Sequence, residues 1–213
     1  MKSGSLPVFI GLCGRSGSGK GTVASFFSEF GIPSLDTDRI YRELTAPEDG
    51  SGRPAPLTAA LADAFGDDIV LPDGSLDRRK LSSIVFREGG DRDRELLNRT
   101  THGAVLDEAE RRAAALFDDG FPIVIIDAPL LFESGFDKKC ALVIATDAPD
   151  ETLVRRIAAR DGIPEEDAAA RLKTQPRPET LPVDLIIDTH RSFASIRKDV
   201  GRLSEIIKEK YGK

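Results

Sequence analysis

Five short apolar runs, each followed by polar or glycine residues, recur along the chain. They are PVFIGLC, IPSLD, FPIVIID, ALVIAT and VDLIID, at residues 7–13, 32–36, 121–127, 141–146 and 183–188. Continuous apolar runs of this length are typical of strands that are buried on both faces, as in a parallel sheet. Helical patterns lie between them, so the sequence predicts a layered α/β fold with roughly five parallel strands. The pattern leaves the order of these strands open.

Two stretches lack a strand pattern and carry helical periodicity instead. Apolar residues recur at helical spacing within 41–117, as in LTAALADAF and RRKLSSIVF, so we expect a helical insertion after the second strand. Residues 150–182 are predicted to form a basic, mobile flap, since helical stretches there precede three prolines and carry Arg155, Arg156, Arg160, Arg171 and Lys173. Aliphatic residues at helical spacing after Ser192 predict a last helix against the sheet.

These patterns divide the 213-residue chain into a core and excursions from it. We expect residues 1–40 and 118–213 to form the core that contains the sheet, and residues 41–117 to form a separate helical region. The flap at 150–182 lies within the second half of the core. A chain of this length can bury one sizeable core.

Composition narrows the classes of function. A formal net charge of −6 removes any bulk attraction to nucleic acid or to an anionic membrane. No segment approaches the roughly 20 apolar residues that cross a bilayer, and we expect a cytoplasmic protein. The two cysteines, Cys13 and Cys140, lie far apart in apolar runs. We therefore expect two core thiols rather than a disulfide framework or a metal site.

A glycine-rich loop follows the first apolar run. In GRSGSGKGT, at residues 14–22, the phosphate-loop pattern G-x-x-x-x-G-K-[ST] matches as far as Gly19 and Lys20. Backbone N–H groups in such a loop cradle a phosphate at the positive end of a helix. The lysine adds a charge that follows the β- and γ-phosphates into the transition state. The loop stands between a predicted strand and a predicted helix over 19–30, which is the context that the motif requires.

Gly21 departs from this motif, because a Ser or Thr at that position normally helps to hold Mg²⁺. The ending GKGT resembles that of adenylate kinases, so we interpret the loop as a working variant that binds nucleotide. Thr22 follows one residue later, and water and carboxylates would take more of the metal's ligand shell. Asp127 ends the apolar run IVIID and is the first candidate for such a carboxylate. Its alternative role is to cap the turn after the strand.

The second strand ends in LDTD, which places two carboxylates close together in the chain. Asp36 and Asp38 lie on one face if the strand remains extended, and they then point into the crevice beyond its carboxyl end. A carboxylate there could accept the proton of an attacking hydroxyl group. One of the two could instead cap the following helix, and we expect each to do one job.

Together these motifs resemble dephospho-CoA kinases, whose signature joins a phosphate loop to D-x-D at this distance. The similarity covers nearly the whole chain through FGDDIVLPDGSLDRRKLSSIVF, LLNRTTHG, DAPLLFESG, RRIAARDGIPEEDAAARLKTQ and VDLIIDT. The resemblance implies a P-loop kinase-type, three-layer α/β fold with a parallel sheet, a helical acceptor-binding region at 41–117 and a helical lid at 150–182. It also implies ATP-dependent phosphorylation of the ribose 3′-hydroxyl of dephospho-CoA, with Mg²⁺.

The resemblance also implies roles for single residues. The ATP phosphates would be held by Ser16, Gly17, Ser18, Gly19, Lys20, Gly21 and Thr22. Asp38 matches the base for the 3′-hydroxyl, with Asp36 beside it, and Arg160 matches a lid arginine that reaches ATP. Arg78 and His102 match residues on the coenzyme A side, although an exposed ion pair and a helix-surface histidine are their alternative readings. The chain departs from the family pattern at Cys13, Gly21, Gly103 and Asp188.

Other functions compete with this one. A nucleoside monophosphate kinase is the second candidate, on the strength of GKGT and the helical insertion. A non-catalytic relative that only binds nucleotide or coenzyme A is the third, because of Gly21. A guanine-specific switch needs N-K-x-D, but the one asparagine of the chain, Asn98, is followed by Arg99, so that class is disfavoured.

Overall fold

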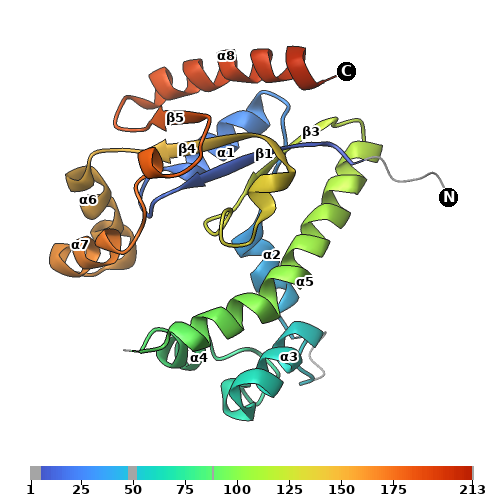
Figure 1. Ribbon diagram of the computed structural model, residues 1–213, viewed down its shortest axis with the longest axis vertical. Coiled ribbons are helices and arrows are strands. Elements are labelled where there is room, and N and C mark those ends of the chain that lie inside the picture. The colour runs from blue at the N-terminus through green and yellow to red at the C-terminus, as the bar shows by residue number, and fades with distance from the viewer. Residues whose placement is uncertain (1–5, 48–51, 88, 213) are drawn as a thin grey trace. The chain divides into compact units, whose positions relative to one another are not determined.

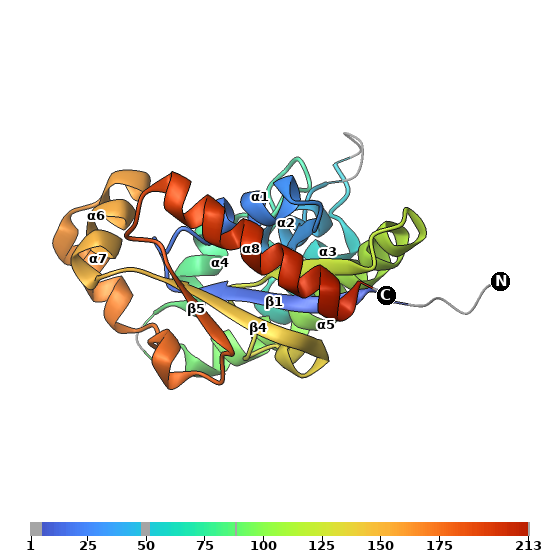
Figure 2. The ribbon, with the colours of Figure 1, turned by 90° about the horizontal axis from the view of Figure 1, so that it is seen from above.

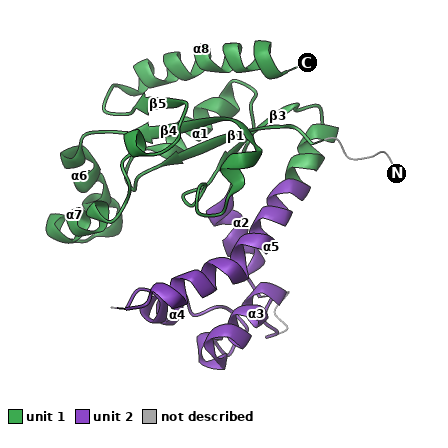
Figure 3. Cartoon of the chain, viewed as in Figure 1, with its two compact units in different colours: residues 1–36, 112–213 green, residues 37–111 purple. Residues whose placement is uncertain are grey.

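The structure is a computed structural model, and it describes residues 6–47, 52–87 and 89–212. Residues 1–5 of the expected core segment, a few residues of the expected helical region and Lys213 lie outside the described part. The chain divides into two compact units (Figure 3). Unit 1 comprises residues 1–36 and 112–213, and unit 2 comprises residues 37–111.

Unit 1 contains a parallel sheet that, within the described residues, has five strands in the order β2-β3-β1-β4-β5. Figure 1 labels β1, β3, β4 and β5 of this sheet. The strands are β1 Val8–Gly14, β2 Ser34–Asp36, β3 Ile123–Asp127, β4 Cys140–Asp147 and β5 Leu185–Asp188. Every predicted strand is present, and the predicted α/β fold is confirmed. Because all strands are parallel, their carboxyl ends meet at one edge of the sheet, where ligands bind in open α/β folds.

Two helices cover one face of this sheet. They are α1 Lys20–Glu29 and α8 Phe193–Tyr211, and Figure 2 shows α8 lying across the strands. Their apolar residues join Ile10 and Leu12 of β1 in the largest core cluster. On α8 the buried positions are Ile196, Val200, Ser204 and Ile207, which lie at helical spacing, and the predicted last helix is confirmed.

The opposite face of the sheet packs against the segment after β3. Phe9 alternates with Ile10 along β1, so its ring points to this face and meets the ring of Phe136 at a centroid distance of 5.2 Å. Leu131 is also fully buried. The helices α6 Asp150–Asp161 and α7 Glu165–Lys173 follow β4 and share a small core of their own.

Unit 2 is helical. It contains α2 Thr37–Leu44, α3 Pro56–Phe65, α4 Arg78–Val85 and most of the long helix α5 Asp91–Asp118. Its core cluster consists of Leu61, Ile69, Leu76, Leu81 and Val85. None of the described residues of 41–117 belongs to the sheet, as the helical periodicity predicts. In the part of the chain that the structure describes, no helix is both long and apolar enough to cross a bilayer.

Candidate active site

The glycine-rich loop connects the end of β1 at Gly14 to the start of α1 at Lys20. Gly17 and Gly19 have φ angles of +76° and +78°, which residues with a side chain rarely adopt. A Cβ atom at Gly17 would also lie 2.9 Å from the carbonyl oxygen of Leu153. The two glycines turn the chain into the first turn of α1, whose backbone N–H groups lack partners inside the helix and favour an anion.

Buried hydroxyl groups hold the loop from the ends of β4 and β5. The hydroxyl oxygens of Ser18 and Thr146 lie 2.7 Å apart. Thr189, which follows β5, donates its hydroxyl to the carbonyl oxygen of Ser18 at 2.7 Å. All three side chains are buried, so these hydrogen bonds fix the shape of the loop without a ligand.

Lys20 forms an ion pair with Asp127, the last residue of β3. The side chain of Lys20 is 17% exposed and that of Asp127 is 7% exposed, so little water screens the pair. The pair joins the start of α1 to the strand next to β1. Asp127 therefore has a structural role in holding the lysine at the loop.

Asp36 lies beside Asp127 at the same edge of the sheet. The two residues are partners in the register of β2 and β3, so their side chains share one face. Thr22 lies in the first turn of α1 and is half-buried. Carboxylate and hydroxyl oxygens are the donors that Mg²⁺ prefers, so the types of residue present fit this ion. No cluster of three or more His, Cys, Asp or Glu side chains suited to a metal occurs among the described residues.

The expectation that Asp36 and Asp38 share one face of an extended strand is wrong. β2 ends at Asp36, and α2 begins at Thr37. Asp38 thus lies in the first turn of a helix, where the backbone N–H groups stabilise a carboxylate. In a strand, side chains two residues apart lie on the same face, whereas in a helix they do not. Asp36 and Asp38 therefore do not share a face as two residues of one strand would.

The lid segment, residues 150–182, brings Arg160 to the loop. The guanidinium of Arg160, in the last turn of α6, donates to the hydroxyl of Ser16 at 3.1 Å. It also pairs with Asp161, and this hydrogen bond raises the pKa of Arg160 above its ordinary value. Arg160 is therefore a permanent cation beside the loop. Arg155 instead donates to the carbonyl oxygen of Glu151 in its own helix.

Three residues that the sequence did not assign to the site also contact the loop or lie in it. Arg156 donates to the carbonyl oxygens of Gly17 at 3.2 Å and Thr189 at 2.8 Å. Its position four residues before Arg160 was the available signal, since that spacing puts both on one helix face. Gln175, the last residue of the stretch that resembles the family lid, accepts a hydrogen bond from the Ser16 amide at 2.7 Å. Arg15 occupies a variable position of the motif and gave no signal.

In unit 2, Arg78 binds a hydroxyl group rather than the carboxylate of its alternative interpretation. Its guanidinium donates to the hydroxyl of Thr45 at 2.8 Å, and that hydroxyl donates to the carbonyl oxygen of Tyr41 at 2.8 Å. Burial raises the pKa of Tyr41, and the positive charge of Arg78 partly opposes the shift. His102 lies on α5 with its Nε2 atom buried, so it is not a fully exposed surface histidine.

Cys13 lies on β1 one residue before the loop. Burial raises its pKa to about 11, although the charge of Lys20 acts in the opposite direction. Burial also raises the pKa of Cys140 to about 12. Both residues are free thiols, and Cys13 is buried as expected, whereas Cys140 is partly exposed.

Comparisons with known proteins identify the family of this chain. The family model described as dephospho-CoA kinase matches residues 8–189. A dephospho-CoA kinase of Corynebacterium glutamicum is 35% identical over 196 residues, which are 91% of this chain and 94% of that protein. Among solved structures, a Thermus thermophilus protein with 28% identity superposes with a TM-score of 0.75, covering 95% of this chain and 99% of its own. The Campylobacter jejuni dephospho-CoA kinase, at 22% identity, has the same fold with a TM-score of 0.57 and covers 95% of this chain and 98% of its own. This chain belongs to the dephospho-CoA kinase family, whose members are phosphotransferases.

Proposed function

We propose that this protein transfers the γ-phosphoryl group of ATP to the 3′-hydroxyl of the ribose of dephospho-CoA and releases coenzyme A and ADP. The observation that carries the proposal is the convergence of two cations on one loop. Lys20 lies at its helical end and Arg160 binds its Ser16, in a chain of the dephospho-CoA kinase family. Phosphoryl transfer depends mainly on positioning and on charge stabilisation, and this loop supplies both.

The proposed roles follow from the chemistry of each side chain. Residues 16–22 bind the ATP phosphates, and the two cations stabilise the charge of the transferring group. Asp38 accepts the proton of the 3′-hydroxyl as that oxygen bonds to phosphorus and the bond to the β-phosphate breaks. We propose that Asp36, Arg78 and His102 bind the acceptor and that residues 41–117 are the acceptor-binding region. The lid, residues 150–182, excludes water.

Thr22 and Asp127 would hold Mg²⁺, with water completing its shell. When bound, the ion would neutralise phosphate charge. Gly21 is compatible with this arrangement, since the missing hydroxyl is one ligand among several.

Release of ADP with different acceptors tests the proposal directly. The purified protein is incubated with ATP and dephospho-CoA, AMP, UMP or no acceptor, and the product is analysed for a 3′-phosphate. We expect release of ADP with dephospho-CoA as the acceptor, and none with AMP, with UMP or without an acceptor. Turnover with AMP or UMP instead would favour a nucleoside monophosphate kinase. Binding of coenzyme A without turnover would favour the non-catalytic relative.

The assignment of the base is tested by two matched variants. Asp38→Asn keeps the size of the side chain but removes its basicity, so phosphorylation in a single turnover should slow by about 10²–10⁴. ATP affinity should persist because the loop is unchanged. Asp36→Asn is the control. If it abolishes transfer while Asp38→Asn is silent, the base is the other carboxylate.

A further inference from the structure

Arg15, the residue after Gly14, carries a buried cation inside the loop. Its side chain is 5% exposed, and it binds Asp147 through Nε at 3.1 Å and through Nη2 at 3.0 Å. Nη1 donates to Asp150 at 2.8 Å. Burial alone would lower the pKa of Arg15, but the hydrogen bonds to Asp150 and Asp147 outweigh it and raise that pKa. The guanidinium therefore stays charged and binds two carboxylates at once.

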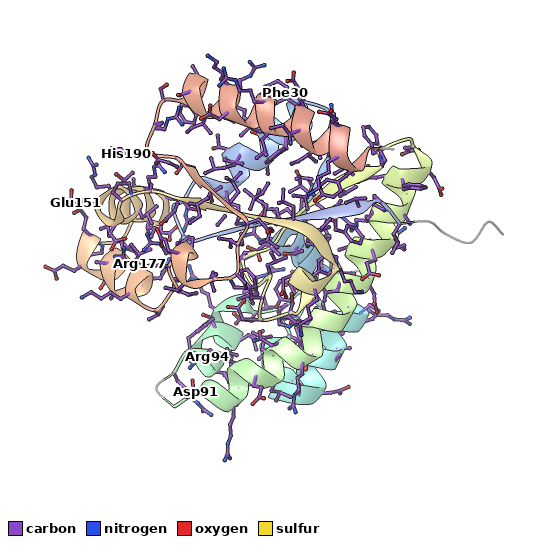
Figure 4. The ribbon with its side chains drawn as sticks, turned by 45° about the horizontal axis from the view of Figure 1, so that its top comes forward. Phe30, Asp91, Arg94, Glu151, Arg177 and His190 are labelled. Carbon is purple, nitrogen blue, oxygen red and sulfur yellow. The ribbon has the colours of Figure 1, made fainter. Side chains whose placement is uncertain are left out.

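The second oxygen of Asp150 extends this contact to the far end of the lid. It accepts a hydrogen bond at 2.5 Å from Arg177, which is labelled in Figure 4 on the segment that follows α7. Asp150 is the first residue of α6, and Arg177 directly precedes the short 3-10 helix Pro178–Thr180. A row of four alternating charges thus joins both ends of the lid to the loop, in the order Asp147, Arg15, Asp150 and Arg177.

The part of the lid between these ends is a packed body. Leu153 and Ile157 of α6 are fully buried against Ala168 and Leu172 of α7. Such a body moves as a unit, so its attachments at the two ends, together with the contacts of Arg156 and Gln175 with the loop, set the place of everything that it carries. It carries Arg160, whose guanidinium binds Ser16.

We propose that Arg15, Asp150 and Arg177 are positioning residues that hold the lid on the phosphate loop and thereby keep Arg160 at Ser16. None of the three has to touch a substrate. The inference rests on the proposed function only in that it gives Arg160 a role in phosphoryl transfer. The placement of the lid itself does not depend on the reaction.

The inner ion pair, between Arg15 and Asp147, and the outer ion pair, between Arg177 and Asp150, differ in solvent exposure. Arg15 and Asp147 are 5% and 13% exposed, whereas Arg177 and Asp150 are 61% and 46% exposed. All four border a cavity of about 670 Å³, which gives water access to the outer pair. An exposed ion pair adds little to the stability of the whole fold and is weakened by salt. Loss of Arg177 should therefore loosen the lid, which Arg156 and Gln175 still bind to the loop, without unfolding unit 1.

Arg177→Gln tests this separation, with Arg197→Gln as the matched control. Arg197 pairs with Glu29 at exposed fractions of 54% and 46%, close to those of the outer pair, and it lies on α8. Amide hydrogen exchange without nucleotide should become about two- to fivefold faster over residues 165–177 in Arg177→Gln, and should stay unchanged there in the control. Arg177→Lys keeps the cation and should restore the slow exchange.

Turnover is the second measurement. At saturating ATP and dephospho-CoA, kcat should fall by the same two- to fivefold factor in Arg177→Gln and recover in Arg177→Lys. Equal exchange in Arg177→Gln and the wild type would overturn the inference. So would faster exchange that spreads equally to α8, because that indicates general destabilisation. If the wild-type protein does not phosphorylate dephospho-CoA, the proposed function fails while the exchange comparison still decides on the lid.

Discussion

Removal of the lysine from the loop should cost stability as well as activity. In Lys20→Met the side chain keeps much of its length but loses the ammonium group. Asp127, with 7% of its side chain exposed, then loses the ammonium group that pairs with it. A buried charge that loses its partner is a large penalty, because the protein interior solvates it poorly.

The size of the effect follows from the burial of the two groups. Breaking a buried ion pair from one side costs about 3–5 kcal/mol. The side chain of Lys20 is 17% exposed and Asp127 has further interactions, so we expect the lower end, about 3 kcal/mol. For a chain of this length that lowers the melting temperature by about 6–12 °C. The double variant Lys20→Met with Asp127→Asn also removes the charge of the carboxylate, and we expect it to recover at least about half of the loss.

Thermal unfolding of the wild type, both single variants and the double variant forms a cycle that isolates the pair. Turnover should be lost in both variants without Lys20, since the neutral double variant restores the fold but not the cation at the phosphates. The reasoning is refuted if Lys20→Met melts within about 2 °C of the wild type, which corresponds to less than about 1 kcal/mol. It is also refuted if the melting temperature of the double variant is no higher than that of Lys20→Met.

Three further predictions concern other parts of unit 1. A Cβ atom at Gly21 would meet nothing within 4 Å, so Gly21→Ser should raise the melting temperature by about 1–2 °C through helix propensity. Its turnover should stay within a few-fold of the wild type, and a hundredfold gain in turnover would mean that the natural loop is impaired. Arg160→Ala should lower kcat markedly and Arg155→Ala should not, and equal effects in steady-state kinetics would contradict the assignment of Arg160. Because burial raises the pKa of Cys13 to about 11 and that of Cys140 to about 12, alkylation of the folded protein at pH 9 should be at least about fifty times slower than in denaturant, and similar rates would contradict the burial.

The sheet and the loop could be predicted because both leave local signals. Each strand is buried on both faces, so it appears in the sequence as an unbroken apolar run, and a glycine loop needs its glycines at fixed positions. The order of the strands could not be predicted. β1 pairs with β3 through Val8 and Ile123 and with β4 through Phe9 and Cys140, and no pattern near β1 indicates either partner.

The contacts that hold the site are not local. Lys20 and Asp127 are 107 positions apart, and Arg15 and Asp150 are 135 positions apart. Each of these residues has a common surface role, so only the folded chain shows the pairing. The prediction that Asp36 and Asp38 share one face required the strand to continue through Asp38. It is wrong because α2 already begins at Thr37. Its role as the base stays a prediction.

The sheet of unit 1 is built from two segments of the chain, and in the sequence the residues of unit 2 separate these segments. β1 and β2 lie within the first 36 residues, whereas β3 begins at Ile123. At a synthesis rate of about 5–20 residues per second, the interval between β2 and β3 lasts roughly 4–17 s on the ribosome.

During that interval β1 has neither of the strands with which it finally pairs, since β3 and β4 both come later. An apolar strand without a neighbour is prone to aggregation. The nascent chain thus emerges with its phosphate loop attached to an unpaired strand, and we expect a chaperone that recognises short apolar segments to bind it first at residues 8–13.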